Sequence, residues 1–151
     1  MFRGAAYLNL DAKGRLAVPA KQRERLLAAG GASLVLTVDR ARCLLLFPAP
    51  AWEVVERDFS ELPAFDDTAL DLRRLYLGNA EDVEMDSQGR ILLPQHLRAF
   101  ASLDKRVAFV GLGVKFEIWD EQRWRDRNEA TLNDPASKEM AMGSALSKLR
   151  F

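Results

Sequence analysis

One decapeptide occurs twice in the chain, as LDAKGRLAVP at residues 10–19 and as MDSQGRILLP at residues 85–94. The two copies lie 75 positions apart and share Asp11 and Asp86, Gly14 and Gly89, Arg15 and Arg90, and Pro19 and Pro94, with Arg23 and Arg98 matching further along. A period of this length exceeds the roughly 20 to 50 residues of solenoid repeats. The repeat therefore indicates a single structural unit that is duplicated within the chain.

Each copy predicts the same order of elements, which is strand, tight turn, strand, helix, strand and strand. Aspartate accepts hydrogen bonds from backbone N–H groups two residues on, and glycine tolerates the positive φ of a tight turn. Asp11, Gly14, Asp86 and Gly89 are therefore predicted to be structural turn residues. The first copy predicts strands at 5–10, 15–18, 33–38 and 43–47, with a helix from Pro19 to the Gly30-Gly31 stop. The second copy predicts strands at 83–86, 90–93, 107–111 and 115–119, with a short helix from Pro94.

Helices are predicted to connect and follow the two copies. A short helix follows Pro50, and Asp66 or Asp67 caps another that ends near Gly78. Two more are expected at 120–132 and 137–149, separated by Asn133-Asp134-Pro135. The predicted boundaries are 5–51 for the first unit, 52–79 for the connecting helices, 80–124 for the second unit and 125–151 for a C-terminal helical tail.

A single unit of short strands and one helix is too small to bury enough apolar surface by itself. We therefore expect both units to fold together into one compact domain. The predicted class is mixed α/β and mainly β, a barrel-like fold with pseudo-two-fold symmetry and flanking helices.

Composition excludes several kinds of site. No apolar run approaches the roughly 18 residues of a membrane span, and the first residues lack the layout of a signal peptide, so a cytoplasmic protein is expected. Cys43 lies in the apolar run CLLLF and is predicted to be buried. With one cysteine and one histidine in the chain, a zinc site is not expected. Neither a cofactor nor a small-molecule ligand is indicated.

Charge is balanced over the whole chain but is unevenly distributed. Residues 1–25 carry six basic side chains against two acidic ones, a net charge of +4. Residues 53–71 carry seven acidic side chains against one basic one, a net charge of −6. The N-terminal segment is thus a local basic patch, which is compatible with nucleic acid as a partner.

The two turns differ in their cations. Lys13 and Arg15 project from the first turn, and such side chains suit phosphate or a guanine edge. The alternative is that Arg15 only locks the turn, by pairing with Asp11 or with backbone carbonyls. Arg90 has no lysine beside it, and the acidic residues around it favour a structural role; these are Glu81, Asp82, Glu84 and Asp86.

Several segments together resemble the MraZ family of bacterial regulators. They are FRG at the start, LDAKGRLAVP, CLLLFPAPAW, RRLYLGNA, MDSQGRILLP and KFEIWD. The resemblance extends from residue 2 to about residue 132, and the motifs are specific when taken together at these spacings.

This resemblance implies two swapped-hairpin units of the AbrB/SpoVT type in one chain and a ring-shaped homo-oligomer. It implies a cytoplasmic, nucleoid-associated regulator, generally a repressor, of the division and cell-wall gene cluster. Such proteins bind short direct repeats of promoter DNA upstream of their own operon. The implied DNA-binding positions are Lys13 and Arg15, with Arg3 close by on the neighbouring strand and Arg90 at the equivalent place in the second unit. No role is implied for the residues after about 133.

Two other classes of function are open to a chain of this kind. An enzyme is not expected, because His96 is the only histidine and no nucleophile or orienting acid stands at a useful spacing from it. A protein-only scaffold ring or an antitoxin-type partner protein is the other alternative. Trp119, Trp124 and Met140 could then dock on other proteins, although such residues more often pack in a core or a subunit interface.

Overall fold

The computed structural model describes residues 1–136 and 148–150. The chain divides into two compact units, Met1–Glu121, here the body of the fold, and Gln122–Phe151, the C-terminal unit. The helix expected at 137–149, with Met140, falls almost entirely outside the described residues. In chain order the described elements are β1 (Phe2–Asn9), β2 (Arg15–Ala17), α1 (Ala20–Gly30), β3 (Ser33–Val38), β4 (Leu44–Pro48), α2 (Ala49–Ser60), α3 (Asp67–Tyr76), β5 (Glu81–Glu84), β6 (Arg90–Leu92), α4 (Gln95–Phe100), β7 (Arg106–Gly113), β8 (Lys115–Asp120) and α5 (Glu121–Asn133).

The two halves exchange their strands. Within Met1–Glu121, β1 pairs with β7 and β5 pairs with β3. Each outer strand of the sheet therefore pairs with a strand from the other half of the repeat. The strand order is β1-β7-β8-β4-β3-β5, and β2 and β6 form a separate two-stranded ribbon. The predicted mixed α/β fold built from duplicated, swapped hairpins is confirmed.

Strand register follows the pseudo-two-fold relation between the copies. Leu16 lies opposite Ile91 in the ribbon, and these residues are equivalent at the offset of 75. Leu45 lies opposite Glu117, and these are equivalent at the shorter offset of 72 that follows the longer turn of the first copy. Both pairs therefore mark the symmetry axis, as expected where equivalent strands pair with each other.

The core is shared by the two halves. Leu16, Ile91 and Phe116 have no exposed surface, and the Phe109 and Phe116 rings stack with their centroids 4.3 Å apart. Cys43 is buried, as predicted. Because burying apolar surface is the main favourable term in folding, neither half has a complete core without the other.

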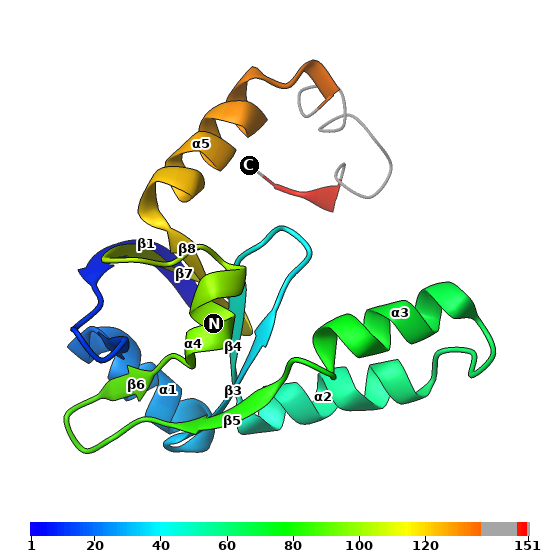
Figure 1. Ribbon diagram of the computed structural model, residues 1–151, viewed down its shortest axis with the longest axis horizontal. Coiled ribbons are helices and arrows are strands. Elements are labelled where there is room, and N and C mark those ends of the chain that lie inside the picture. The colour runs from blue at the N-terminus through cyan, green and yellow to red at the C-terminus, as the bar shows by residue number, and fades with distance from the viewer. Residues whose placement is uncertain (137–147, 151) are drawn as a thin grey trace. The chain divides into compact units, whose positions relative to one another are not determined.

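The connecting helices α2 and α3 form a helical hairpin beside β3 (Figure 1). The predicted cap is confirmed, since the Asp66 side chain accepts hydrogen bonds from the backbone N–H groups of Thr68 and Ala69. The hairpin is anchored at its base, where the buried Thr37 hydroxyl donates to the carbonyl of Tyr76 at 2.6 Å. Burial raises the pKa of Tyr76, whose hydroxyl donates to Asp39.

Element boundaries depart from prediction at a few places. β1 begins at Phe2 rather than at residue 5, because β7 is long enough to pair with every residue back to Phe2. Gly4 lies in this added stretch with a φ of +90°, a conformation that glycine adopts easily.

None of the helices in the described part of the chain is long and apolar enough to cross a membrane.

Candidate nucleic-acid interface

The first hairpin turn is closed by its aspartate. Asp11 Oδ1 accepts hydrogen bonds from the backbone N–H groups of Lys13 and Arg15, each at 2.9 Å. The Arg15 Nε donates to Asp11 Oδ2 at 2.6 Å. The hydrogen bond from the Arg15 backbone N–H is the main cause that holds the pKa of Asp11 below its ordinary value. The turn therefore fixes both the backbone and the direction of the arginine.

The second turn repeats this arrangement atom for atom. Asp86 Oδ1 accepts from the backbone N–H groups of Gln88 and Arg90, and Arg90 Nε donates to Asp86 Oδ2 at 2.9 Å. The side chains of Arg15 and Arg90 make equivalent ion pairs and are exposed to a similar degree, 29% and 31%. Neither contacts nor exposure therefore shows which arginine binds DNA and which is structural. What differs between the turns is Lys13, whose counterpart is Gln88.

The lowered pKa of Asp11 gives the turn a defined pH dependence. Because the folded pKa lies below the ordinary value of 3.8, the ionised carboxylate stabilises the fold above that pH and loses this contribution as pH falls through the folded pKa. Asp11→Asn should therefore melt at a lower temperature than wild type near neutral pH, and the gap should close towards acid. Melting curves between about pH 2 and 7 check this. A gap that stays constant over the whole range would contradict it.

Both arginines lie on one exposed face of the β2–β6 ribbon. Arg15 is opposite Leu92 and Arg90 is opposite Ala17, while Leu16 and Ile91 point to the core between them. Directly opposed residues share a face, and so do residues two apart on one strand. The Cα atoms of the two arginines are thus separated by about 8 Å, from two residues of strand rise and one strand spacing.

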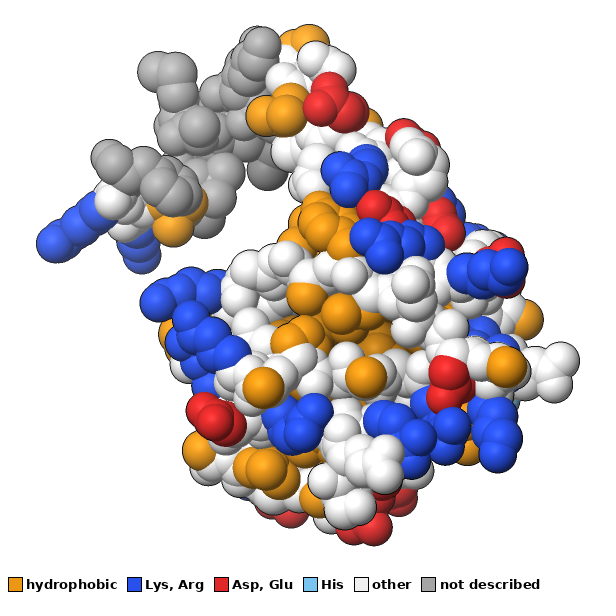
Figure 2. Space-filling view, turned by 90° about the vertical axis from the view of Figure 1, so that its left-hand side faces the viewer, with side chains coloured by type: hydrophobic (Ala, Val, Ile, Leu, Met, Phe, Trp, Pro, Cys, Tyr) orange, Lys and Arg blue, Asp and Glu red, His pale blue; other side chains and the backbone are white. Residues whose placement is uncertain are grey.

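This outer face is free to meet a ligand. Leu92 is 54% exposed, and the terminal amino groups of Arg15 and Arg90 have no hydrogen-bond partner within the described residues. Both turns lie at the left of Figure 1, and Figure 2 looks onto that side. Lys and Arg side chains are spread over the lower part of that view, with fewer Asp and Glu side chains among them (Figure 2).

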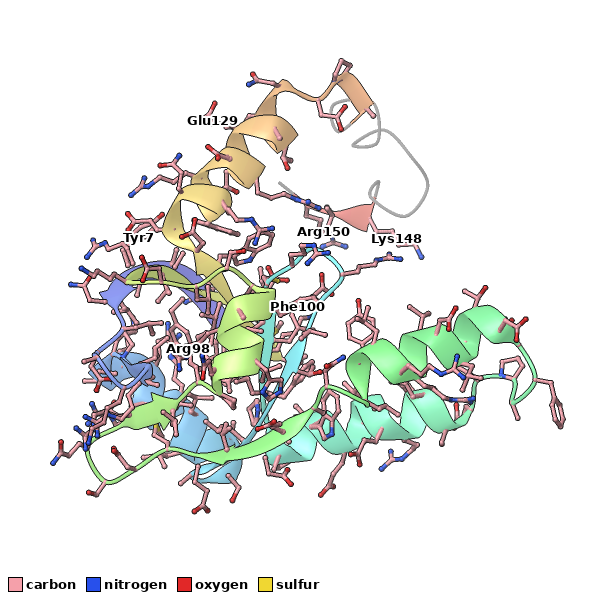
Figure 3. All side chains as sticks on the ribbon, viewed as in Figure 1. Tyr7, Arg98, Phe100, Glu129, Lys148 and Arg150 are labelled. Atoms are coloured by element: carbon pink, nitrogen blue, oxygen red, sulfur yellow. The ribbon has the colours of Figure 1, made fainter. Side chains whose placement is uncertain are left out.

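Each turn is braced by an arginine from the other half. The Arg98 guanidinium, on α4 (Figure 3), lies so close to Gly14 that a Cβ built there would be 2.5 Å from Arg98 Cζ. The Arg98 Nε donates to the carbonyl of Leu93, whose own N–H donates to the carbonyl of Gly14. The second half's helix thereby holds the first half's turn.

The reciprocal brace is made by Arg23. A Cβ on Gly89 would collide with Arg23 Nε, and Arg23 Nη2 donates to the carbonyl of Val18 at 3.3 Å. The N–H of Val18 in turn donates to the carbonyl of Gly89. The match of Arg23 with Arg98 at the offset of 75 was the available sequence signal, but it did not reveal which turn each arginine touches.

Arg3 lies at the opposite end of β1 from the first turn. Arg3 is at the start of β1 and the turn follows its end, roughly 20 Å away at the usual strand rise. The carbonyl of Arg3 instead accepts a hydrogen bond from Gln22 Nε2 on α1. The length of β1 therefore separates Arg3 from the first turn, and a contact of Arg3 with DNA stays a prediction.

The residues singled out for other functions have ordinary positions. His96 is 57% exposed, and its Nε2 lies 3.1 Å from Glu81 Oε1. Trp119 is 4% exposed and its Nε1 donates to Glu117, so it packs in the body of the fold rather than on a docking surface. Trp124 lies on α5, in the compact unit Gln122–Phe151.

Comparison with known proteins covers both halves of the chain. A family model described as "MraZ protein, putative antitoxin-like" matches residues 1–75 and again residues 76–142, in line with the internal duplication. Transcriptional regulator MraZ of Nitrosospira multiformis is 49% identical over 132 residues, which are 87% of this chain and 90% of that protein.

Two further relatives carry the same name. The protein of the same name from Thioalkalivibrio sulfidiphilus is 52% identical over 130 residues, or 85% of this chain and 87% of that one. The one from Halorhodospira halophila is 44% identical over 150 residues, 99% of either chain. These relatives are named as regulators, which agrees with the prediction that the chain is not an enzyme. Matched in both halves and over most of its length, the chain belongs to the MraZ family.

Proposed function

We propose that this chain is a sequence-specific DNA-binding regulator of transcription and that the outer face of the β2–β6 ribbon is its DNA-binding surface. The observation that carries the proposal is the placing of Arg15 and Arg90 on one exposed face, with Lys13 at its edge. The relatives' name, transcriptional regulator, supports the same function.

The geometry of the ribbon suits the major groove of DNA. A two-stranded ribbon fits into that groove, where an arginine fork recognises guanine or binds phosphate. Asp11 and Asp86 orient the guanidinium groups of the two arginines by accepting from Nε. The terminal amino groups remain available to bind the ligand. Lys13 adds a cation to the first turn only, so we assign the larger share of binding to that turn and a smaller share to Arg90.

One ribbon would bind weakly, because a few phosphate contacts give limited and salt-dependent affinity. We therefore propose that several copies, in a ring, engage direct repeats of promoter DNA together. Linked contacts of this kind raise affinity by roughly 10² to 10⁴. This explains how a chain with no net charge can bind DNA. We further propose that the bound protein represses its own operon and the division and cell-wall genes, and that it is located at the nucleoid.

A competing function is that of an antitoxin-type or scaffold protein whose partner is another protein. The description of the matching family as antitoxin-like is the observation in its favour. It predicts that the ribbon surface can be altered with no effect on DNA binding.

Titration of the purified protein against DNA from the region upstream of its own gene tests the proposal. Binding should be tighter than to a shuffled duplex of the same length, and it should weaken steeply as salt is raised. The preference should need at least two tandem repeats in the duplex. Equal binding to both duplexes at every salt concentration would leave the protein-partner function as the better account.

A further inference from the structure

A groove lies on the body of the fold, away from the hairpin turns. Its volume is about 670 Å³, and its floor is mainly apolar. Phe2, Ala28, Ala51 and Val114 are among the residues that line it, and Arg3 and Arg25 supply its charge. An apolar cavity of about 150 Å³ accommodates a benzene ring, so this groove has room for an aromatic side chain together with its neighbours.

An aromatic side chain without any cover stands at the tip of the α2–α3 hairpin. Phe65 is fully exposed, at 101%, in the loop between the two helices. The loop around it is held in place, because the Arg73 guanidinium donates to the carbonyls of Phe59 and Leu62. Asp66 next to it caps α3. Phe65 is thus presented on a preorganised loop, which lowers the entropic cost of docking.

The groove and the tip of one copy cannot meet. The groove includes Pro48 and Ala51, at the start of α2, whereas Phe65 follows the end of that helix. Twelve helical residues span about 18 Å, and the hairpin runs away from the body of the fold (Figure 1). The occupant of the groove must therefore come from another molecule.

Charge favours a second copy of this chain as that molecule. The segment 53–71 has a net charge of −6, and its exposed acids near the tip include Glu61 and Asp67. The groove offers Arg3 and Arg25 at its apolar floor. An aromatic side chain flanked by acids is the complement of an apolar groove that carries two arginines.

We propose that the α2–α3 tip of one copy docks in this groove of the next, with Phe65 on the apolar floor and Glu61 and Asp67 beside Arg3 and Arg25. The contact is heterologous, since each copy has one tip and one groove. Such contacts continue from copy to copy until the rotation closes them into a ring. This contact would build the oligomer on which the proposed function rests. The contact itself is supported by the groove and the tip, and it does not depend on DNA binding.

Sedimentation velocity of the full chain tests the contact. Wild type should sediment as an assembly of several copies, whereas Phe65→Ser and Val114→Glu should each sediment as monomers. Phe65 and Val114 are exposed, so both variants should still fold and should keep the far-ultraviolet circular dichroism of wild type. Leu132→Ser is the matched control, since it removes an apolar side chain that is 65% exposed on α5 and should leave the assembly unchanged.

An equimolar mixture of the two variants gives a sharper result. Phe65→Ser retains a working groove and Val114→Glu retains a working tip, so one contact can form and the next cannot. The mixture should sediment as dimers and no larger. A wild type that is monomeric, a Phe65→Ser protein of full assembled size, or a mixture that stays monomeric would each overturn the proposal.

A second measurement separates this proposal from that of DNA binding. A short duplex with a single repeat needs one ribbon only, so Phe65→Ser should bind it as well as wild type does at low salt. Binding to tandem repeats should fall by about 10² to 10⁴ in the same variant. If Phe65→Ser loses assembly but wild type shows no preference for upstream DNA, the docking contact stands and the proposed function fails. The reverse outcome rejects the docking contact alone.

Discussion

Arg15→Ala is expected to lower affinity for tandem upstream DNA by about 10²- to 10⁴-fold. Each charge-assisted contact of an arginine fork is worth roughly 10- to 100-fold in affinity, and at least two copies lose it at once. The fold should persist, because the Asp11–Arg15 pair is an exposed ion pair and such pairs add little stability. Equilibrium titration, sedimentation velocity and a melting curve measure the three quantities.

Two matched variants give this result its meaning. Arg74→Ala removes an arginine from another exposed ion pair, with Asp71 on α3, and should leave DNA binding unchanged. Arg90→Ala removes the equivalent arginine of the second turn and should weaken DNA binding less than Arg15→Ala does, since no lysine adjoins it. If Arg15→Ala unfolds the protein while Arg90→Ala alone removes DNA binding, the assignment of the two turns is wrong.

Gly14→Ala is expected to destabilise the fold by about 1 to 3 kcal/mol. Gly14 has a φ of +80°, and an added Cβ would meet the Arg98 guanidinium at 2.5 Å. Arg98 must then move and give up its hydrogen bond to the carbonyl of Leu93. For a chain of this size the melting temperature should fall by roughly 3 to 10 °C.

A double-mutant cycle separates the strain of the backbone from the contact with Arg98. In an Arg98→Ala background, Gly14→Ala should cost less, because the clash is gone and only the backbone strain is left. Arg23→Ala is the matched control, since Arg23 braces the other turn and its effect should add to that of Gly14→Ala. Coupling of Gly14 to Arg23 rather than to Arg98 would show that the braces are not exchanged between the halves.

Local residue chemistry is enough to predict the elements of each half. The Asp and Gly of each turn, the proline before each helix and the alternation in the strands act over a few residues, and the elements lie close to where those residues place them. The buried Cys43 and the Asp66 cap follow from equally local rules. The position of Arg3 within β1 was not predicted, because local alternation placed the start of that strand at residue 5 and not at Phe2.

Contacts between the halves cannot be predicted in the same way. The pairing of β2 with β6 depends on burying Leu16 and Ile91 together, and the residues alone do not say which strand joins which half. The exchange of strands between the halves was predicted only from the resemblance to the MraZ family. Comparison of the copies aligned Arg23 with Arg98, yet only the fold shows that each braces the turn of the other half.

The central claim, that the ribbon face contacts DNA, can be tested with a DNA-cleaving iron chelate tethered to one cysteine. Cys43 is buried, so a cysteine introduced at the exposed Ala12, in the first turn, would be the reactive one. The conjugate of Ala12→Cys should cleave upstream DNA once in each repeat, and a conjugate of Asp58→Cys on α2 should not. Cleavage from Asp58→Cys alone, or from neither conjugate while the DNA is bound, would contradict the account.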